Sequence, residues 1–138
     1  MSRPAYVYKL IPSSSPPPNP LPIHLPLSTL DESSGFIHLS MATQVPGTLR
    51  HFFASEPKVY VLQIPYDRIE KDIRWESPDA SVCGERPGEG LFPHLYNGGK
   101  LGSEEVESVA EWENTNLGNE TGWDDALKKA ESFFTVCH

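Results

Sequence analysis

Apolar residues recur along this chain in short runs that have the two-residue period of β-strands. The segments with this pattern, or with the aromatic and β-branched content typical of strands, are 5–10, 35–40, 58–65, 67–76 after an initial turn, 91–96 and 104–113. The run 58–65 is apolar at both odd and even positions, which predicts a central strand. The run 104–113 alternates between apolar residues and mostly glutamates, which predicts a half-exposed edge strand.

Helical spacing is found in two segments. Residues 43–53 predict a short helix, because Pro46 falls in the first turn, where proline is tolerated. The core face predicted for this helix consists of Leu49, Phe52 and Phe53. Residues from about 121 to 135 form an amphipathic pattern with a capping-box-like start at Thr121 and Asp124. Since strands outnumber helices, the predicted class is α+β, with a small antiparallel or mixed sheet and flanking helices.

The segment 12–27, between the first two predicted strands, is rich in proline. Proline fixes its backbone and lacks an N–H donor, so this segment is incompatible with a helix or a central strand. We expect an extended, polyproline-like surface loop. A ligand for an SH3-type domain would have flanking basic residues, which this segment lacks, so a loop insertion is the favoured interpretation.

The charge balance limits the classes of ligand. The chain has 138 residues, enough for one hydrophobic core, and a net charge of −8 with Lys and Arg scattered singly. Such a surface repels phosphate backbones, so a polynucleotide partner is not expected. A single nucleotide or another small molecule is compatible with this charge, since a few placed groups suffice to bind it.

Membrane and metal functions are also disfavoured. No apolar run approaches the length of a membrane span or a signal peptide, so we expect a cytoplasmic protein that does not bind membranes. Cys83 and Cys137 are far apart and have no Cys or His neighbours at metal-ligand spacing. No metal is therefore expected.

Two short runs share an unusual pattern. GFIHLS (35–40) and LFPHLY (91–96) each place a histidine in an apolar run, with a hydroxyl residue two positions later. Side chains alternate across a strand. The histidine-bearing faces therefore comprise Phe36, His38 and Ser40 in the first run, and Phe92, His94 and Tyr96 in the second. If both faces line one cleft, they form an apolar pocket with a few polar groups, which is typical of a small-molecule site.

These histidines have two interpretations. A lone strand histidine is more often a satisfied structural residue than a catalyst. Two with matching neighbours favour a site, because buried imidazoles need partners and titrate near neutral pH. The weaker candidates are His24, His51 and His138. The carboxylates that could act as a base are Glu76, Glu85 and Glu89, and spacing alone does not choose among them.

The segments DESSGFIHLSMATQVPGTLRHFF, IRWE and GEGLFPHLY resemble the family called domain of unknown function 952 (DUF952). Its members carry a Gly-Phe-Ile-His-Leu-Ser block with an Asp ahead of it and a Gln after it, and a later Phe-Pro-His-Leu-Tyr block. The resemblance extends from about Ala5 to about Trp112. It identifies residues 1–138 as one domain of this type, with a proline-rich loop at 12–27 and a C-terminal helix at about 121–135.

The resemblance implies a fold similar to the ADP-ribosyltransferase superfamily, in which a small split sheet holds NAD in its cleft. The first block is also similar to the His-Val-His-Leu-Ser block of RNA 2′-phosphotransferases, which use NAD to remove a phosphate. On this basis the candidate catalytic residues are His38, His94 and Glu76. The candidate cofactor-binding residues are Tyr8, Phe36, Ser40, Gln44, Phe92 and Tyr96.

The chain departs from these relatives in its other charged residues. None of the arginines falls in the phosphotransferase motifs: Arg3, Arg50, Arg68, Arg74 and Arg86. No glutamate occupies the third-strand position of toxin-type transferases. RNA phosphate removal and standard protein ADP-ribosylation are therefore disfavoured.

Three functions remain open from the sequence. The first is an ADP-ribosyl transferase or hydrolase that uses NAD. The second is a small-molecule enzyme that performs acid–base chemistry, such as isomerisation or cyclisation, in the same cleft. The third is a non-catalytic ligand-binding module, since a fold does not fix a function.

Overall fold

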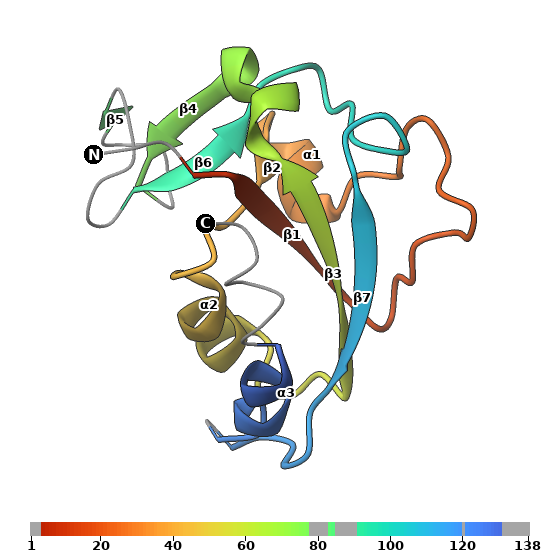
Figure 1. Cartoon of the computed structure of the whole chain (residues 1–138), viewed down its shortest axis with the longest axis vertical. Helices are drawn as coiled ribbons and strands as arrows, with labels where there is room; N and C mark the ends of the chain where they lie inside the picture. Colours follow the sequence, from red (N-terminus) through yellow and green to blue (C-terminus); the bar gives the residue numbers. More distant parts are fainter. Residues whose placement is uncertain (1–3, 78–82, 85–90, 120, 131–138) are drawn as a thin grey trace.

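Strands dominate the computed structural model, which describes residues 4–77, 83–84, 91–119 and 121–130. They form two antiparallel sheets (Figure 1). The first is three-stranded, in the order β1 (Tyr6–Pro12), β3 (Lys58–Pro65) and β7 (Ser108–Glu113). The second is four-stranded, in the order β2 (Ile37–His38), β6 (Phe92–Leu95), β4 (Ile73–Glu76) and β5 (Cys83–Gly84). The predicted α+β class and antiparallel pairing are confirmed.

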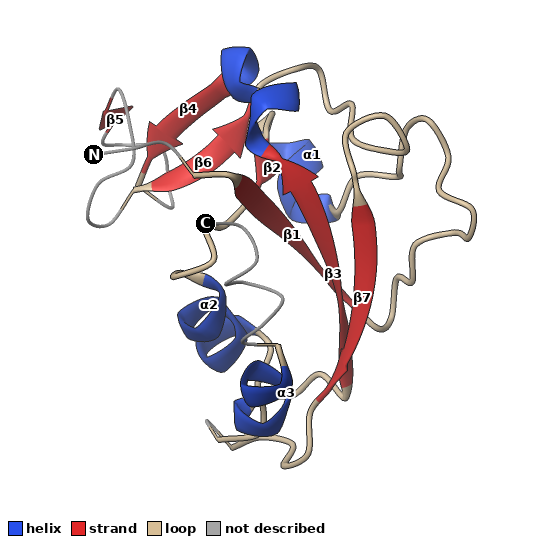
Figure 2. Ribbon diagram, viewed as in Figure 1, coloured by secondary structure: helices blue, strands red, loops and turns tan. Residues whose placement is uncertain are grey.

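The helices are short. They are α1 (Thr29–Ser34), α2 (Val45–Phe52) and α3 (Asp124–Lys129), with the 3-10 turns η1 (Tyr66–Arg68) and η2 (Glu70–Asp72) ahead of β4. Helices α2 and α3 lie against one face of the first sheet (Figure 2). The residues that join them to that face include Val45, Leu49 and Ala126 from the helices, Trp123 just before α3, and Tyr8, Val61 and Trp112 from the strands.

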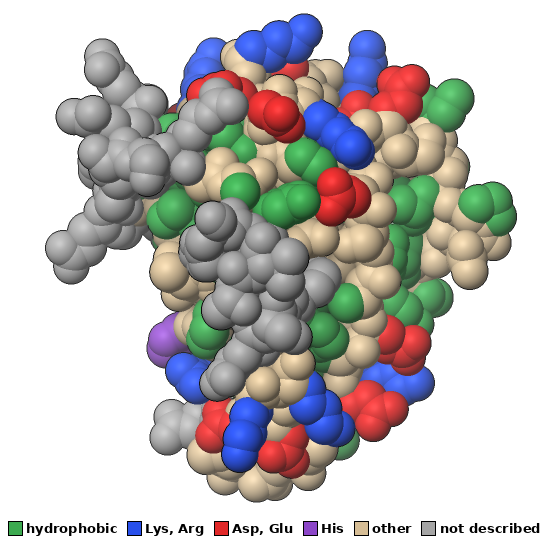
Figure 3. Space-filling model, viewed as in Figure 1, with side chains coloured by type: hydrophobic (Ala, Val, Ile, Leu, Met, Phe, Trp, Pro, Cys, Tyr) green, Lys and Arg blue, Asp and Glu red, His purple; other side chains and the backbone are tan. Residues whose placement is uncertain are grey.

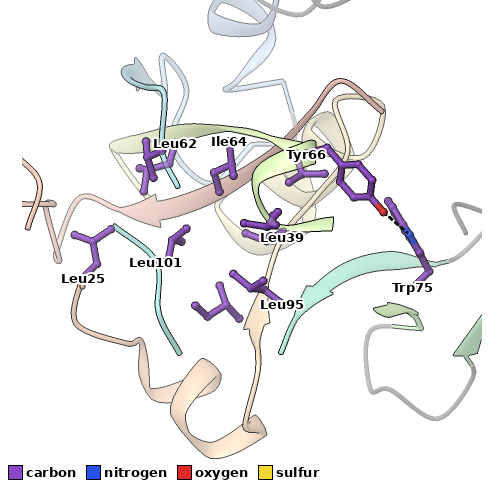
Figure 4. Close-up of a cluster of buried hydrophobic side chains, with 12 residues drawn as sticks. Leu25, Leu39, Leu62, Ile64, Tyr66, Trp75, Leu95 and Leu101 are labelled. Atoms are coloured by element: carbon purple, nitrogen blue, oxygen red, sulfur yellow. Dashed lines mark hydrogen bonds between the residues drawn. The ribbon is translucent and has the colours of Figure 1, made fainter. Parts of the chain in front are cut away.

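Strand alternation divides the apolar residues of the first sheet between two cores. On β3, Val59 and Val61 face the helices, whereas Leu62 and Ile64 belong to the core that also contains Leu95 of the second sheet. Figure 4 shows this second core, with Leu39, Leu62, Ile64 and Leu95 converging between the sheets and the Trp75 indole donating to the Tyr66 hydroxyl, 3.2 Å away. Burial on both faces and a position between β1 and β7 confirm β3 as the central strand.

The proline-rich segment does not extend freely into solvent along its whole length, because its C-terminal part packs against the rest of the domain. Residues 13–27 contain neither helix nor strand. The Leu25 side chain is 8% exposed and packs in the core between the sheets. Its backbone N–H donates to the carbonyl of Leu101 over 2.7 Å, and the Ser103 N–H donates to the carbonyl of Pro22 over 2.9 Å.

Three local predictions are wrong. Helix α2 does bury Leu49, but Phe52 is 78% exposed, because the helix turns that position away from the sheet. Helix α3 begins after Trp123 without a side-chain cap, and the Thr121 hydroxyl donates instead to Asn119. The Ser-, Pro- and Gly-containing composition of residues 77–90 predicts a loop throughout, yet Cys83–Gly84 pair with Trp75 and Glu76 as β5.

Other predicted elements are shorter than expected. The first histidine run contributes Ile37–His38 to β2 and a separate bridge between Ser40 and Tyr8. The acidic edge strand begins at Ser108, not at residue 104. Of the helix predicted for about 121–135, the structure contains α3, and the predicted part after residue 130 lies outside the described residues.

The charged side chains visible on one face of the molecule are of both signs (Figure 3). On the face in Figure 3, Lys and Arg side chains are interspersed with Asp and Glu, without a basic stripe. No helix within the described part of the chain is long and apolar enough to cross a membrane.

The docking of the proline-rich segment gives a stability prediction. A Cβ on Gly102 would overlap the backbone carbonyls of Pro22 and Ile23, whereas a Cβ on Gly47 in α2 would meet no atom within 4 Å. We expect Gly102→Ala to lower the free energy of unfolding by about 1–3 kcal/mol, as overpacking does. Gly47→Ala is expected to raise it by up to about 1 kcal/mol. Urea unfolding of both variants measures this, and equal midpoints would show that the segment does not pack tightly.

Candidate functional site

The two faces of the second sheet differ in chemistry. In the strand register His38 of β2 lies opposite His94 of β6, and His94 lies opposite Arg74 of β4. We call this side the histidine face; it consists of Phe36, His38, Arg74, Glu76, Phe92, His94 and Tyr96. The other side packs into the core between the sheets through Ile37, Leu39, Trp75 and Leu95.

Aromatic and imidazole rings pack directly against one another on the histidine face. The ring centroids of His38 and His94 are 5.1 Å apart, in an edge-on arrangement. Phe36 lies between the groups, with its ring centroid 4.3 Å from His94, 4.5 Å from His38 and 5.0 Å from Tyr96. His38 and His94 are 56 positions apart in the sequence and lie on one face of the sheet. Side-chain alternation predicted which residues share a face within each run, and the strand register brings the two runs together.

Each imidazole is held by a carboxylate through the same ring nitrogen. Nδ1 of His38 is 2.7 Å from Oδ1 of Asp31, and Nδ1 of His94 is 2.9 Å from Oε1 of Glu76. An ionised carboxylate only accepts hydrogen bonds, so each Nδ1 carries a proton. In the neutral imidazole, Nε2 is then the basic nitrogen that can receive a proton or a hydrogen bond from a ligand.

Asp31 is the most highly connected acid of the site. Its carboxylate, 2% exposed, also accepts from Nζ of Lys9 over 2.6 Å and from the His38 backbone N–H over 3.2 Å. Burial alone would raise the pKa of Asp31, but the hydrogen bond from His38 and the charge of Lys9 outweigh it and lower the pKa. Asp31 therefore remains ionised at neutral pH and keeps His38 in one orientation.

Local sequence places Asp31 beside His38. Ser28 caps α1 by accepting from the Asp31 backbone N–H over 3.1 Å, and Gly35 ends the helix with φ 81°, a left-handed conformation that suits glycine. The chain then turns back into β2. This short helix brings a carboxylate seven positions earlier onto the imidazole of His38.

Glu76 joins His94 to Tyr96. The same oxygen, Oε1, accepts from Nδ1 of His94 and from the Tyr96 hydroxyl, the latter over 2.6 Å. Burial lowers the pKa of His94, and the hydrogen bond to Glu76 does not fully compensate. His94 is therefore neutral at pH 7.

The two imidazoles differ in their access to solvent. The His38 side chain is 24% exposed, whereas the His94 side chain is 1% exposed and that of Glu76 is 7% exposed. A ligand can thus reach His38 directly, while His94 and Glu76 lie behind it as a buried pair.

The other predicted site residues have mixed placements. Phe36 and Tyr96 belong to the ring cluster, and Phe92 is half-buried opposite Glu76. Tyr8 is 1% exposed and packs in the core under the helices, and its backbone pairs with that of the buried Ser40. Gln44 connects the two motifs, because its side chain accepts from the Met41 N–H over 2.9 Å and donates to the Leu91 carbonyl over 2.6 Å. Glu85 and Glu89 lie outside the described residues.

Sequence reasoning missed Asp31, Lys9 and Arg74 as site residues. A signal for Asp31 was present: Ser28 three positions before it and Gly35 four positions after it are the boundaries of a short helix. For Lys9, which meets Asp31 across 22 positions of sequence, no local pattern exists. Among the described residues there is no group of three or more His, Cys, Asp or Glu side chains able to hold a metal ion.

Comparisons with known proteins place the chain in a family and a fold. A family model described as "Protein of unknown function (DUF952)" matches residues 23–109. The crystal structure of CC0527 from Caulobacter crescentus is similar with a TM-score of 0.61 and 22% identity, covering 89% of this chain and 98% of that one. The solution NMR structure of CC0527 gives a TM-score of 0.54 at 22% identity, covering 79% and 85%. No curated protein matches. At this identity the solved structures establish the fold alone.

Replacing the buried acid tests its role. In Asp31→Asn the ammonium of Lys9 loses its counter-charge, so we expect a loss of about 3 kcal/mol in the free energy of unfolding at pH 7. The exposed neighbour provides a matched control, and Glu32→Gln is expected to change stability by less than about 0.5 kcal/mol.

The same pair of variants has a defined pH dependence. The folded pKa of Asp31 is below its ordinary value of 3.8, so the stabilisation is complete above pH 3.8 and is lost as the pH falls through the folded pKa. The difference in free energy of unfolding between wild type and Asp31→Asn should therefore decrease as the pH falls through the folded pKa. Urea unfolding from pH 7 downward measures it, and a constant difference would contradict the ionised pair.

His94 predicts a second pH effect, nearer neutrality. Its folded pKa is below the ordinary value of 6.5, so below pH 6.5 the unfolded chain binds a proton that the folded one does not. Wild type should lose stability as the pH falls from 6.5 through the folded pKa, and His94→Gln should lose less. His24→Gln removes an exposed histidine and should keep the wild-type dependence; identical curves for all three proteins would rule out this effect.

Proposed function

The chain belongs to the DUF952 family, and we propose that it binds NAD at the histidine face and acts as an ADP-ribosyl transferase or hydrolase with an ADP-ribosyltransferase-like fold. The observation that carries the proposal is the meeting of two carboxylate-held imidazoles with aromatic rings on one sheet face. The resemblance of the first histidine block to NAD-using enzymes supports the choice of ligand.

His38 is the group that we assign to the ribose of NAD. Its side chain is the accessible imidazole, and its Nε2 is free to accept a hydrogen bond from a ribose hydroxyl because Nδ1 is occupied by Asp31. Phe92 is the ring that we assign to the nicotinamide. It is half-buried beside Glu76 in the register, whereas the ring of Tyr96 already contacts Phe36 and Arg74.

The carboxylates behind the imidazoles suit the charge that develops in this reaction. When the C1′–N bond breaks, its electron pair leaves with nicotinamide and the ribose acquires positive charge, as in other glycosyl transfers. Water or an acceptor hydroxyl then adds to C1′ and releases its proton to solvent. Glu76, buried and bound to His94 and Tyr96, supplies fixed negative potential without having to reorganise.

A second function has its own support. The accessible imidazole of His38, held at Nδ1 by Asp31, offers a base at Nε2, with the ring of His94 centred 5.1 Å from it. Acid–base chemistry on another small organic substrate, such as isomerisation or cyclisation, could use this base.

Nicotinamide release and ligand titration separate these functions. With NAD at millimolar concentration, we expect the ring resonances of His38 to shift in NMR spectra and nicotinamide to be released. His38→Ala should reduce release by about 10-fold, because the ribose loses one hydrogen bond. His51→Ala removes an exposed histidine of α2 and is the matched control.

The remaining outcomes assign the other functions. Unchanged His38 and His94 resonances with millimolar NAD would overturn the NAD proposal and leave acid–base chemistry on another substrate. Binding that leaves NAD chemically intact after long incubation would identify a ligand-binding module.

A further inference from the structure

Arg74 is placed on the histidine face by the strand register. It is the Cα partner of His94 on the neighbouring strand, and His94 is in turn the partner of His38. Paired residues of adjacent strands project to the same side of a sheet, so the three side chains form one row. With strands about 4.8 Å apart, the Cα atoms of His38 and Arg74 are separated by about 10 Å.

The guanidinium of Arg74 is positioned by an aromatic ring. Its Cζ is 4.3 Å from the ring centroid of Tyr96. The hydroxyl of the same tyrosine donates to Glu76, which also holds His94, so the ring that supports Arg74 is anchored to the buried pair. Stacking uses the flat face of a guanidinium and leaves its N–H edge available for two parallel hydrogen bonds.

Arg74 forms no ion pair with any carboxylate in the described part of the chain. The side chain is exposed, and within the described ranges no carboxylate lies at ion-pair distance from it, although the chain contains 19 acidic residues. On the histidine face, the carboxylates of Asp31 and Glu76 are already used by the imidazoles, Lys9 and Tyr96. The row therefore runs from the accessible imidazole of His38 to a guanidinium that lies over the Tyr96 ring and pairs with none of the described carboxylates.

We propose that Arg74 is the phosphate-binding residue of the histidine face, and that the ligand of this site is a phosphorylated sugar or nucleotide. The sugar lies at His38 and its phosphate forms a two-pronged contact with Arg74, which arginine makes better than lysine. This inference rests on the proposed function in placing the ligand on the histidine face, but it requires neither NAD nor turnover.

Ligands that differ only in a phosphate test the proposal. We expect wild type to bind nicotinamide mononucleotide about 10–100-fold more tightly than nicotinamide riboside, as a charge-assisted contact implies. Isothermal titration calorimetry and NMR titration measure the ratio of the two affinities. Adenosine monophosphate against adenosine provides a second pair, and inorganic phosphate is titrated alone.

Substitutions assign that ratio to one side chain. Arg74→Gln should reduce the affinity ratio to about 1. Arg74→Lys should give a ratio between those of Arg74→Gln and wild type, because lysine keeps the charge but cannot form the two parallel hydrogen bonds of a guanidinium. Arg68→Gln, another exposed arginine in the turn before β4, should keep the wild-type ratio. A simple structural role for Arg74 would weaken the phosphorylated and unphosphorylated ligands alike.

Failure of this inference differs from failure of the proposed function. If the nicotinamide ligands do not bind, but adenosine monophosphate or inorganic phosphate shifts the resonances of the histidine face and Arg74→Gln abolishes the shifts, the NAD proposal fails and the phosphate contact stands. A wild-type ratio near 1 in every pair, or an undiminished ratio in Arg74→Gln, overturns the phosphate contact.

Discussion

The histidine face depends on the hydrogen bonds and the ion pair that the buried carboxylate of Asp31 forms. Lys9 comes from the first sheet, His38 from the second and Asp31 from the helix between them, so one side chain joins three elements. A buried charge costs several kcal/mol unless it is paired and hydrogen-bonded, and here both carboxylate oxygens have partners. The orientation of His38 is therefore coupled to the packing of the two sheets, and a shift between the sheets would reach the imidazole through Lys9 and Asp31.

Burial separates the roles of the two imidazoles. Both are fixed by a carboxylate at Nδ1, yet one is accessible at the edge strand and the other is enclosed by Phe36 and the neighbouring strands. Protonation of His94 would place a charge among these buried rings, which is why its pKa is lowered. The enclosed pair is suited to a fixed electrostatic background, and the accessible one to contact with a ligand.

The sequence was sufficient for those features that depend on local periodicity. Alternation along 35–40 and 91–96 predicted which side chains share a face, since that follows from strand geometry alone. Features set by long-range packing were not predictable in this way. The pairing of His94 with His38 on one side and Arg74 on the other depends on strand order. Phe52 is exposed because of how α2 is rotated on the sheet, and Lys9 meets Asp31 only in the folded chain. Helix α1 was missed because TLDESS has no apolar stripe, although its boundaries were marked by Ser28 and Gly35.

The net charge of the chain limits how an anionic ligand can be recognised. At −8 the protein as a whole repels a phosphate, and this repulsion extends over about 8 Å at physiological salt. The net charge therefore provides no long-range attraction for such a ligand. If Arg74 forms the proposed phosphate contact, binding would depend on short-range groups, namely this guanidinium and the rings beside it. Selectivity among phosphorylated ligands would then come from the fit of the sugar and base, since every phosphate would experience the same repulsion and meet the same arginine.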